Sequence, residues 1–490
     1  MSVERVVLRR GLYADSVTLM QLSREIATAD GVQAALVAMA TELNLDVLAG
    51  MGFTLPAESD SANDLLIAVR AQDEKIVETA LNLADQLLSA PTRAQPEGGG
   101  NALPPRTVSA AVRASSPGLA FISVPGQHAF TEAMDALDSG CDVMVFSDNV
   151  PIEAEIVLKD TANERGLLVM GPDCGTAVIG GIGLGFSHTV DAGPIAVVAA
   201  SGTGAQQVLC LLDAAAVGVS AAIGVGGRDL SQAVAGRSTR AALQRLDDDP
   251  GTELILLVSK PPAAEVAEDL RTLAAELRTP VQFALLGEGE TDLTAAVSKA
   301  LTTLNRPVPR WPAVIGRRPQ IPSGAVLRGL FCGGTLCDEA MLIATASLGP
   351  IFSNTPLRPE WALDSSLRSR HASMIDFGDD ALTRGRAHPM IDPSLRTEAL
   401  RAALADPTTG VVLLDVVLGH GSHPDPVGEL LPSIERAGVP VVISLIGARR
   451  DPQGLDASRE RLHRAGASVF GSNAEAARYA VSLITQRDSS

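Results

Sequence analysis

Two turns rich in glycine, serine and threonine are the segments of this sequence most suited to hold a charged ligand. Each follows an apolar segment and precedes a helical pattern, as PIAVVAASGTG at residues 194–204 and AVLRGLFCGGTL at residues 325–336. Glycine lets the backbone approach a ligand, and the following helix directs unpaired N–H groups and the positive end of its dipole toward it. The turns are therefore candidate sites for phosphate or carboxylate, although such turns also need small residues for packing. The candidate residues are Ser201, Gly202 and Thr203 in the first turn and Gly334 and Thr335 in the second.

Basic side chains and histidines near other strand ends could complete an anion site. The motif Gly226-Gly227-Arg228 and Lys260 each follow a further apolar segment, so both cations would lie beside the first turn and offset the charge of a leaving phosphate. Histidine titrates near neutral pH and could take a proton from a substrate. The candidates are His388, His420 and His423, with loop packing as an open alternative for each and metal binding as another for the last two.

The five cysteines predict neither a disulfide framework nor a zinc site. They are odd in number and scattered, and none forms a Cys-x-x-Cys pair. Cys337 follows the second turn, where a helix N-terminus could lower the pKa of a thiol, but a small core residue would suit the same position. Cys174 allows the same two interpretations. We expect no metal.

The motifs around the two turns also match, which indicates an internal duplication. Residues 224–229 (GVGGRD) follow the first turn and residues 375–380 (IDFGDD) the second, and Asp-Pro turns at 249–250 and 406–407 then precede apolar segments. The second copy carries an insertion around residues 352–371. A duplicated unit of this size predicts two similar α/β domains rather than a short solenoid repeat. Ahead of them, residues 119–124, 142–146 and 166–170 alternate with helical stretches and predict a Rossmann-like parallel sheet.

Residues 1–89 predict a small α+β domain with a split βαβ arrangement. No cluster of catalytic residue types occurs in it, so we expect a role in regulation or assembly. Pro- and Gly-rich linkers are predicted at 90–106 and 306–323. The predicted strands lie at residues 6–8, 32–40 and 64–69, and the predicted helices at residues 16–29, 44–51 and 74–88.

Composition limits the classes of partner. The chain has 490 residues, 46% of them hydrophobic but only 3% aromatic, which suits parallel sheets covered by helices. A formal net charge of −18 argues against nucleic acid or an anionic membrane as a partner. No segment reaches the roughly 18 uninterrupted apolar residues that a membrane span requires, and the N-terminus does not resemble a signal peptide. We expect a cytoplasmic protein that acts on a small anionic substrate.

The order of motifs resembles the α subunit of succinyl-CoA synthetase. Gly171-Pro172-Asp173-Cys174 is similar to that family's Gly-Pro-Asn-Cys turn, residues 201–203 match its Ser-Gly-Thr, and residues 224–227 its Gly-Ile-Gly-Gly. The similarity covers about residues 115–310. With the extra N-terminal domain and the pattern GHGSHPDP at residues 419–426, the whole chain resembles the FdrA family, a branch described as acyl-CoA synthetase-like.

This resemblance implies a multidomain α/β fold. The domains would be a ferredoxin-like domain at 1–89, a Rossmann-like domain of the CoA-binding type at 107–190, and two flavodoxin-like ligase domains at 191–305 and 324–490. Members of the FdrA branch are implicated as a subunit of oxamate carbamoyltransferase in allantoin breakdown. The resemblance thus implies that carbamoyl phosphate and oxamate are interconverted with oxalurate and phosphate, in a homo- or hetero-oligomer with companion subunits.

The sequence departs from the synthetase pattern at residues that its chemistry needs. The phosphorylated histidine of those enzymes lies in a loop that corresponds here to residues 285–292 (LLGEGETD), which contain no histidine. The Gly-rich turn that would bind CoA is missing, and so is an ATP-grasp domain. We therefore assign no cofactor and favour carbamoyl transfer with phosphate or carbamoyl phosphate as substrate. An acyl-CoA synthetase that works with a partner chain and a non-catalytic acyl- or phosphate-binding scaffold are the alternatives.

Overall fold

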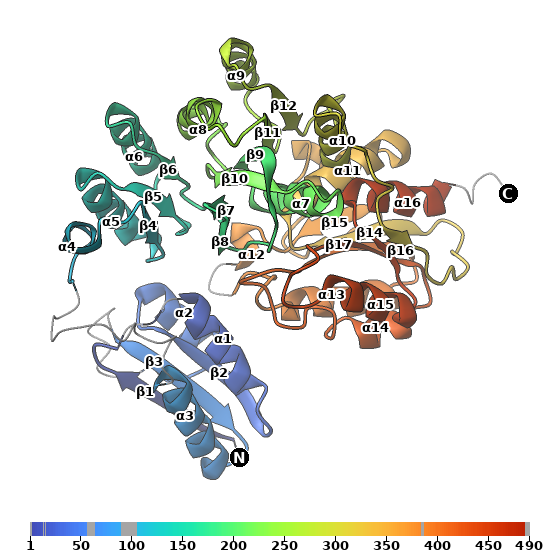
Figure 1. Cartoon of the computed structure of the whole chain (residues 1–490). Helices are drawn as coiled ribbons and strands as arrows, with labels where there is room; N and C mark the ends of the chain where they lie inside the picture. Colours follow the sequence, from blue (N-terminus) through green and yellow to red (C-terminus); the bar gives the residue numbers. More distant parts are fainter. Residues whose placement is uncertain are drawn as a thin grey trace. The chain divides into compact units, whose positions relative to one another are not determined.

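The chain forms two compact units in the computed structural model (Figure 1). The first comprises residues 1–106 with 383–387, and the second comprises residues 107–382 with 388–490. The structure describes residues 2–12, 14, 16–55, 64–89, 105–383 and 387–485. The predicted linker at 90–106 lies outside the described residues except at its last two positions.

The first unit is a three-stranded antiparallel sheet in the order β1-β3-β2, with helices on both faces. The central strand β3 lies between the two strands of the β1-α1-β2 segment, so the predicted split βαβ arrangement is confirmed. Successive side chains of a strand point to opposite faces: Leu65, Ile67 and Val69 pack with α1 and α3, whereas Leu66 and Ala68 pack with α2. The elements are β1 (Val3–Arg9), α1 (Ser16–Ala27), β2 (Val32–Met39), α2 (Glu42–Gly50), β3 (Leu65–Ala71) and α3 (Glu74–Ser89).

The second unit begins with a Rossmann-like segment whose short parallel sheet has the order β4-β5-β6. Its core contains many alanines, among them Ala129, Ala133 and Ala136 on one face of α5, which let the helix lie close to the sheet. The elements are α4 (Val108–Ser115), β4 (Leu119–Ile122), α5 (Gly126–Asp138), β5 (Asp142–Val145), α6 (Ile152–Glu164) and β6 (Val169–Met170).

The first ligase-like sheet has the order β12-β11-β9-β10-β7-β8. Strands β9 to β12 are parallel, and the β7–β8 hairpin, which falls in the range 107–190, joins this sheet by antiparallel pairing with β10. Helices α7 and α10 cover one face, and α8 and α9 the other. The elements are β7 (Thr176–Ile179), β8 (Ile182–Gly185), β9 (Ala192–Ala200), α7 (Gly202–Ala214), β10 (Val219–Gly224), α8 (Arg237–Asp247), β11 (Leu254–Ser259), α9 (Ala264–Glu276), β12 (Val281–Leu285) and α10 (Leu293–Thr303).

The second ligase-like sheet has the order β13-β18-β17-β16-β14-β15, in which β17-β16-β14-β15 correspond to β12-β11-β9-β10 of the first. Its five parallel strands follow the flavodoxin-like order, so the predicted α/β fold class is confirmed. In Figure 1, α11 and α16 lie on one face and α13, α14 and α15 on the other. The elements are β13 (Ala313–Val314), β14 (Val326–Phe331), α11 (Gly334–Leu348), β15 (Ser373–Asp376), α12 (Asp380–Thr383), α13 (Ser394–Ala405), β16 (Thr409–Val417), α14 (Leu431–Glu435), β17 (Val441–Ile446), α15 (Leu455–Ala465), β18 (Ser468–Phe470) and α16 (Asn473–Thr485), with a 3-10 turn at Pro359–Trp361.

The segment at 306–323, predicted as a linker, packs against both ligase-like domains. Trp311 is buried in the core of the first domain, and β13 pairs antiparallel with β18 of the second. The Arg317 guanidinium donates to three backbone carbonyls, those of Ile434, Glu435 and Ala465.

A buried group of charges joins the Rossmann-like segment to the first ligase-like domain. Lys159 of α6 is fully buried, and its Nζ donates to Glu155 Oε1 (2.7 Å), Asp229 Oδ1 (2.8 Å) and the Val225 carbonyl (3.0 Å). Asp229 also accepts the backbone N–H groups of Ser238 and Thr239 at the start of α8. This network holds the loop that follows β10, which carries the Gly226-Gly227-Arg228 motif.

Replacing the buried lysine by an apolar side chain of similar length should destabilise the second unit strongly. Lys159→Met leaves two carboxylates without their shared cation in a buried position, a change that costs about 3–5 kcal/mol. Urea unfolding of the full chain would measure the loss. The matched control is Arg464→Met, which removes the cation of an exposed pair with Glu460 and should change the free energy of unfolding by less than about 1 kcal/mol. Equal effects of the two variants would contradict a structural role for the buried network.

Candidate functional site

The two glycine-rich turns meet at the N-termini of α7 and α11. Ser201 is the N-cap of α7, where its Oγ accepts the N–H of Gly204, and the same Oγ lies 2.6 Å from Thr335 Oγ1 in the first turn of α11. A Cβ at Gly333 would lie 2.9 Å from the Thr203 side chain, so only glycine fits there. The duplication therefore brings two positive helix ends together.

A buried carboxylate fixes the backbone of the second turn through hydrogen bonds. Asp415 of β16 accepts the backbone N–H groups of Cys332 (2.8 Å) and Gly333 (2.9 Å), and Arg396 Nη1 donates to it (2.7 Å). Both side chains are buried. Burial raises the pKa of Asp415, although Arg396 and the two backbone bonds act against this rise. These bonds orient the turn that opens α11, which has no side-chain cap of its own.

Lys260 extends from the end of β11 over the start of α11. A Cβ built at Gly334 would lie 2.7 Å from Lys260 Nζ and 2.6 Å from Asp376 Oδ2, so an ammonium group and a carboxylate face this glycine together. Lys260 Nζ also lies 3.7 Å from Asp338 Oδ2. The surrounding protein lowers the pKa of Lys260, but Asp338 and Asp376 raise it above its usual value. The site thus holds a firmly charged cation beside two helix N-termini.

Carboxylates that the sequence analysis did not select surround this cation. Burial raises the pKa of Asp376 at the end of β15 to about 7. Asp173, which is open to the solvent between the strand ends, also has its pKa raised to about 7 by the surrounding protein and by Asp380 and Asp148. Both aspartates therefore titrate at physiological pH. Their position at or shortly after the end of a strand, within the motifs Gly-Pro-Asp-Cys and Ile-Asp-Phe-Gly, was the available signal in the sequence.

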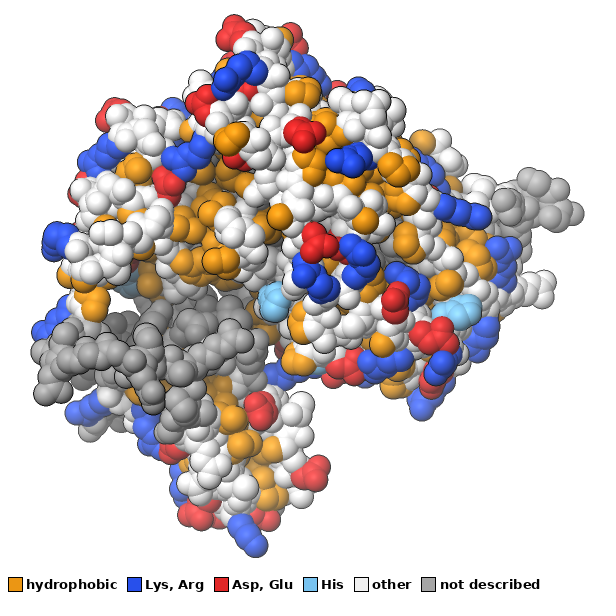
Figure 2. Space-filling view, viewed as in Figure 1, with side chains coloured by type: hydrophobic (Ala, Val, Ile, Leu, Met, Phe, Trp, Pro, Cys, Tyr) orange, Lys and Arg blue, Asp and Glu red, His pale blue; other side chains and the backbone are white. Residues whose placement is uncertain are grey.

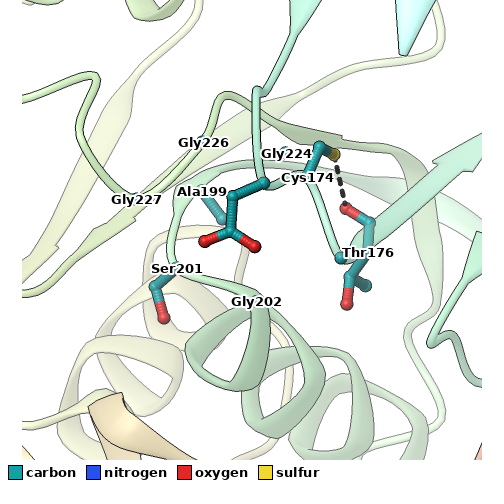
Figure 3. Close-up of a pocket in the computed structure, with 10 residues that line it drawn as sticks. Cys174, Thr176, Ala199, Ser201, Gly202, Gly224, Gly226 and Gly227 are labelled. Atoms are coloured by element: carbon teal, nitrogen blue, oxygen red, sulfur yellow. Dashed lines mark hydrogen bonds between the residues drawn. The ribbon is translucent and has the colours of Figure 1, made fainter. Parts of the chain in front are cut away.

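A small cavity of about 10 Å³ adjoins the start of α7 (Figure 3). Figure 3 shows Ser201 and Gly202 at the start of the helix, with the glycine-rich loop 224–227 and the Cys174–Thr176 segment around them. The cavity is also lined by Asp173. Gly226 is required here for two reasons, because its φ is +90° and a Cβ would lie 2.4 Å from the Pro172 carbonyl oxygen.

Arg228 is anchored away from the turns. Its Nη2 lies 2.8 Å from Glu155 Oε2 and donates to the Val150 carbonyl at 2.8 Å, so the guanidinium is attached to α6 and to the segment just before it. It still lowers the pKa values of Asp173 and Asp380 through its charge. The structure therefore places Arg228 at the rim of the site and Lys260 at its centre.

His388 lies beside Asp376. A Cβ at Gly378 would lie 2.8 Å from His388 Nε2 and 3.2 Å from Asp376 Oδ1, so these side chains are neighbours. Burial lowers the pKa of His388 to about 4, and its Nδ1 accepts the Met390 N–H. At neutral pH the imidazole is therefore uncharged and carries its hydrogen on Nε2. It can donate a hydrogen bond to a ligand oxygen through this nitrogen.

The loop that carries His420 and His423 contacts the His388 segment. The backbone N–H of His423 donates to the Met390 carbonyl (2.7 Å), and its Nδ1 accepts the N–H of Asp425 (3.0 Å). His420 is exposed, and its Nε2 lies 3.0 Å from Thr189 Oγ1. The structure gives both rings a contact within the loops, and only His388 lies directly beside the carboxylates of the site.

Of the two interpretations of Cys337 and Cys174, the structure supports the core residue and not the reactive thiol. All five thiols are free and buried. Burial raises the pKa of Cys174 to about 12 and that of Cys337 well above its usual value, with nearby carboxylates adding to the shift. The loss of hydration therefore outweighs the effect of the α11 N-terminus on Cys337. Among residues 2–12, 14, 16–55, 64–89, 105–383 and 387–485, no group of three His, Cys, Asp or Glu side chains could hold a metal ion.

The surface carries charges of both signs. On the face in Figure 2, Lys and Arg side chains are interspersed with Asp and Glu side chains and with hydrophobic ones. No helix in the described part of the chain is both long and apolar enough to span a membrane.

Comparisons with known proteins agree with this architecture. Residues 1–104 match the family model "AllF, heavy metal-associated domain", and residues 330–483 match the model "CoA-ligase". The uncharacterized protein YahF of Escherichia coli K12 is 40% identical over 457 residues, which cover 88% of this chain and 87% of YahF. The chain belongs to the same family as YahF.

More distant relatives are less similar to this chain. The α subunit of the ADP-forming succinate–CoA ligase of Aquifex aeolicus is 28% identical over 181 residues, covering 36% of this chain and 58% of that subunit. Among solved structures, the dinucleotide-forming acetyl-coenzyme A synthetase 1 of Ca. Korarchaeum cryptofilum, in complex with phosphate and ADP, is 17% identical. That match covers 76% of this chain and 82% of the synthetase, with a TM-score of 0.29.

Anion affinity should fall as the pH rises, because two aspartates at the site lose their protons near pH 7. As the pH rises from 6 to 8 through their pKa of about 7, Asp173 and Asp376 lose protons and place negative charge beside the helix N-termini. Sulfate, whose own charge is constant in this range, should bind about fivefold or more weakly at pH 8, because one unit charge about 4 Å away contributes about 1 kcal/mol even in water. Calorimetry would measure this fall.

The variant Asp376→Asn should make the pH dependence shallower, because it removes one of the two site aspartates whose pKa is about 7. The matched control is Asp456→Asn, which removes the carboxylate of an exposed pair on α15 and should leave the dependence unchanged. Sulfate binding that is independent of pH in the unmodified chain would exclude Asp376 and Asp173 from the anion site.

Proposed function

We propose that the chain is an FdrA-type subunit of a cytoplasmic oxamate carbamoyltransferase in allantoin breakdown. The observation that carries this proposal is the position of Lys260 over the N-terminus of α11, where α7 also begins and where two aspartates and a neutral imidazole lie nearby. Such a site combines a binding site for an anion with carboxylates that exchange protons near pH 7. Carbamoyl phosphate carries its own activation, so a transferase of this kind requires no nucleotide.

The proposed reaction is a substitution at the carbamoyl carbon. The amide nitrogen of oxamate forms a bond to this carbon, the bond from the carbon to the phosphate oxygen breaks, and the nitrogen loses one proton. The products are oxalurate and hydrogen phosphate, so atoms and charge balance. The reverse reaction is the phosphorolysis of oxalurate.

In this proposal each group at the site has a role suited to its charge. The phosphate of the donor binds where the two helices begin, with Lys260 offsetting its charge as it leaves. Asp376, whose pKa is about 7, takes the proton from the acceptor nitrogen. The uncharged His388 donates from Nε2 to the carbonyl oxygen on which charge develops. His420 and His423 shape the adjacent loop.

An acyl-CoA synthetase that works with a partner chain is the second candidate. The match of residues 330–483 to the CoA-ligase model and the succinate–CoA ligase relatives favour it. Residues 285–292, where the resemblance places the phosphorylated histidine, carry acidic side chains instead: Glu288 lies near Arg358 and Glu290 pairs with Arg271. A partner chain cannot easily supply a histidine inside this domain, so we favour carbamoyl transfer.

Activity should require companion subunits. The Aquifex relative is by name the α subunit of a ligase, which supports an active site completed by another chain. The purified chain alone should show at most a trace of phosphate-dependent oxalurate cleavage, and the complex co-purified with its companions should show turnover. In the complex, Lys260→Gln should lower kcat/KM by about 100-fold or more, because a charge-assisted contact that forms at the leaving phosphate is lost. Full turnover by the isolated chain, or an active Lys260→Gln complex, would contradict this arrangement.

The chain should not form phosphohistidine. After incubation with labelled ATP, CoA and succinate, we expect no acid-labile label, because no histidine occurs in residues 285–292. A succinate–CoA ligase α subunit that carries the histidine serves as the positive control. Stoichiometric labelling of His388, His420 or His423 would favour the synthetase instead.

A further inference from the structure

The insertion of the second copy covers the outer edge of β15. In the described part of the chain β15 is the last strand of its sheet, whereas its counterpart β10 in the first copy pairs with β7. The insertion lies between the end of α11 at Leu348 and the start of β15 at Ser373, while only residues 215–218 separate α7 from β10. A strand edge presents unpaired N–H and C=O groups. In the second copy, residues 352–354 bind these groups of β15.

Phe352 covers the start of this edge as an ordinary strand residue would. Its N–H donates to the Ala372 carbonyl (3.0 Å), and its carbonyl accepts the Met374 N–H (2.9 Å). Every second residue of a strand directs its N–H and C=O to the same neighbour. The next groups that β15 presents at this edge are therefore those of Asp376, the last residue of the strand and the proposed proton acceptor of the site.

The backbone of the insertion turns away before it reaches Asp376. Ser353 is buried and pairs with the far part of the insertion, because its N–H donates to the Trp361 carbonyl (3.1 Å) and its carbonyl accepts the Leu363 N–H (2.8 Å). These bonds fix residues 352–354 from the side opposite β15. The end of the strand is then left to a side chain, that of Asn354.

The amide of Asn354 takes the place of a backbone peptide at the end of β15. Its Oδ1 accepts the Asp376 N–H (2.9 Å), and its Nδ2 donates to the Asp376 carbonyl (2.9 Å). An amide suits this task because it carries a donor and an acceptor on one planar group. Both outward backbone groups of Asp376 are thus bound by one side chain, which leaves no open backbone position for water at this residue.

The environment of the Asp376 carboxylate makes this cover important. The side chain is buried, its Oδ1 accepts the Gly378 N–H (2.9 Å), and burial raises its pKa to about 7. Asn354 carries no charge, so it acts on this carboxylate through position and the exclusion of water. The titratable and charged groups that face Asp376 from the other elements are Lys260, Cys332, Cys337, Asp338, His388 and Asp415.

We propose that Asn354 is the positioning residue of Asp376: it closes the end of β15 against water and fixes the backbone from which the carboxyl group reaches the anion site. The insertion then gives the second copy a task that the first copy lacks. The role of Asp376 in proton transfer rests on the proposed function, whereas the effect of Asn354 on anion binding does not.

Sulfate binding tests this role in the Asp173→Asn background, which removes the other aspartate whose pKa is about 7. In Asn354→Ala, water reaches the end of β15 and the pKa of Asp376 falls toward its usual value. If the pKa falls by about one, the fraction of protonated Asp376 is about tenfold lower at pH 8 but only about twofold lower at pH 6. We expect calorimetry to show losses of sulfate affinity in this proportion, because the ionised carboxylate repels the anion.

Two further variants separate positioning from general damage to the insertion. Asn354→Asp keeps an acceptor for the Asp376 N–H but adds a negative charge, which raises the pKa of Asp376, so sulfate affinity should fall less between pH 6 and pH 8 than in the background. Thr355→Ala removes a hydroxyl that contacts only Ser353 Oγ among the described residues, and it should change affinity less than about twofold at either pH.

Several results would overturn the positioning role. They are an equal or absent loss at the two pH values in Asn354→Ala, a fall in Asn354→Asp as steep as in the background, a pH-dependent loss in Thr355→Ala, and no sulfate binding in the background. If Asn354→Ala does not fold, Asn354→Asp decides alone.

Failure of the proposed function gives a different result. In the phosphorolysis of oxalurate Asp376 returns its proton, so Asn354→Ala should lower kcat/KM of the co-purified complex about tenfold at pH 8 and about twofold at pH 6. If the complex shows no phosphorolysis but sulfate binding responds as expected, the positioning role stands and carbamoyl transfer does not. If phosphorolysis occurs and Asn354→Ala lowers it equally at both pH values, carbamoyl transfer stands and the positioning role does not.

Discussion

The site depends on the buried pair of Asp415 and Arg396. The carboxylate accepts two consecutive backbone N–H groups of the turn before α11, so it takes donors that would otherwise face the ligand space and fixes the direction in which the helix begins. Arg396 donates to this carboxylate in the interior, where an unpaired buried carboxylate would be costly. The position of Gly334 under Lys260, and of Thr335 against Ser201, follows from this anchored turn.

Two helix N-termini that meet repel one another, and this repulsion explains the acidic surroundings of an anion site. Each helix end carries about half a positive charge, and Lys260 adds a full one. Asp338, Asp376 and Asp173 offset this charge when no anion is bound. The surrounding protein and neighbouring carboxylates raise the pKa of Asp173 and of Asp376 to about 7, so both can take up protons when an anionic ligand enters. The net charge of these aspartates therefore becomes less negative when an anion binds.

Much of the fold could be predicted from the sequence, because strand and helix periodicity and the Gly-Thr turns are local signals. The split βαβ unit and the duplicated α/β topology followed from them. The packing of residues 306–323 did not, since Pro-rich composition does not reveal that Trp311 is buried or that β13 pairs with β18. At the site, Lys260 and the two turns were selected, but Asp376, Asp173 and Asp415 were not. Their roles arise from contacts between strand ends far apart in sequence, and an aspartate after a strand is also common in ordinary turns.

At this site, residue type alone does not predict which side chain exchanges protons at neutral pH, as the histidines show. A histidine at a strand end suggests a base near neutral pKa, yet burial makes His388 uncharged and its Nδ1 is already engaged with a backbone N–H. The aspartates, whose usual pKa is near 4, are shifted to about 7 by the same environment. Burial thus moves the capacity to exchange protons at neutral pH from the imidazole to the carboxylates. Residues 285–292 contain no histidine, and aspartates that titrate near pH 7 lie around Lys260. Both features fit the proposed function, in which the carbamoyl group passes directly from donor to acceptor and no phosphoryl group is carried on the protein.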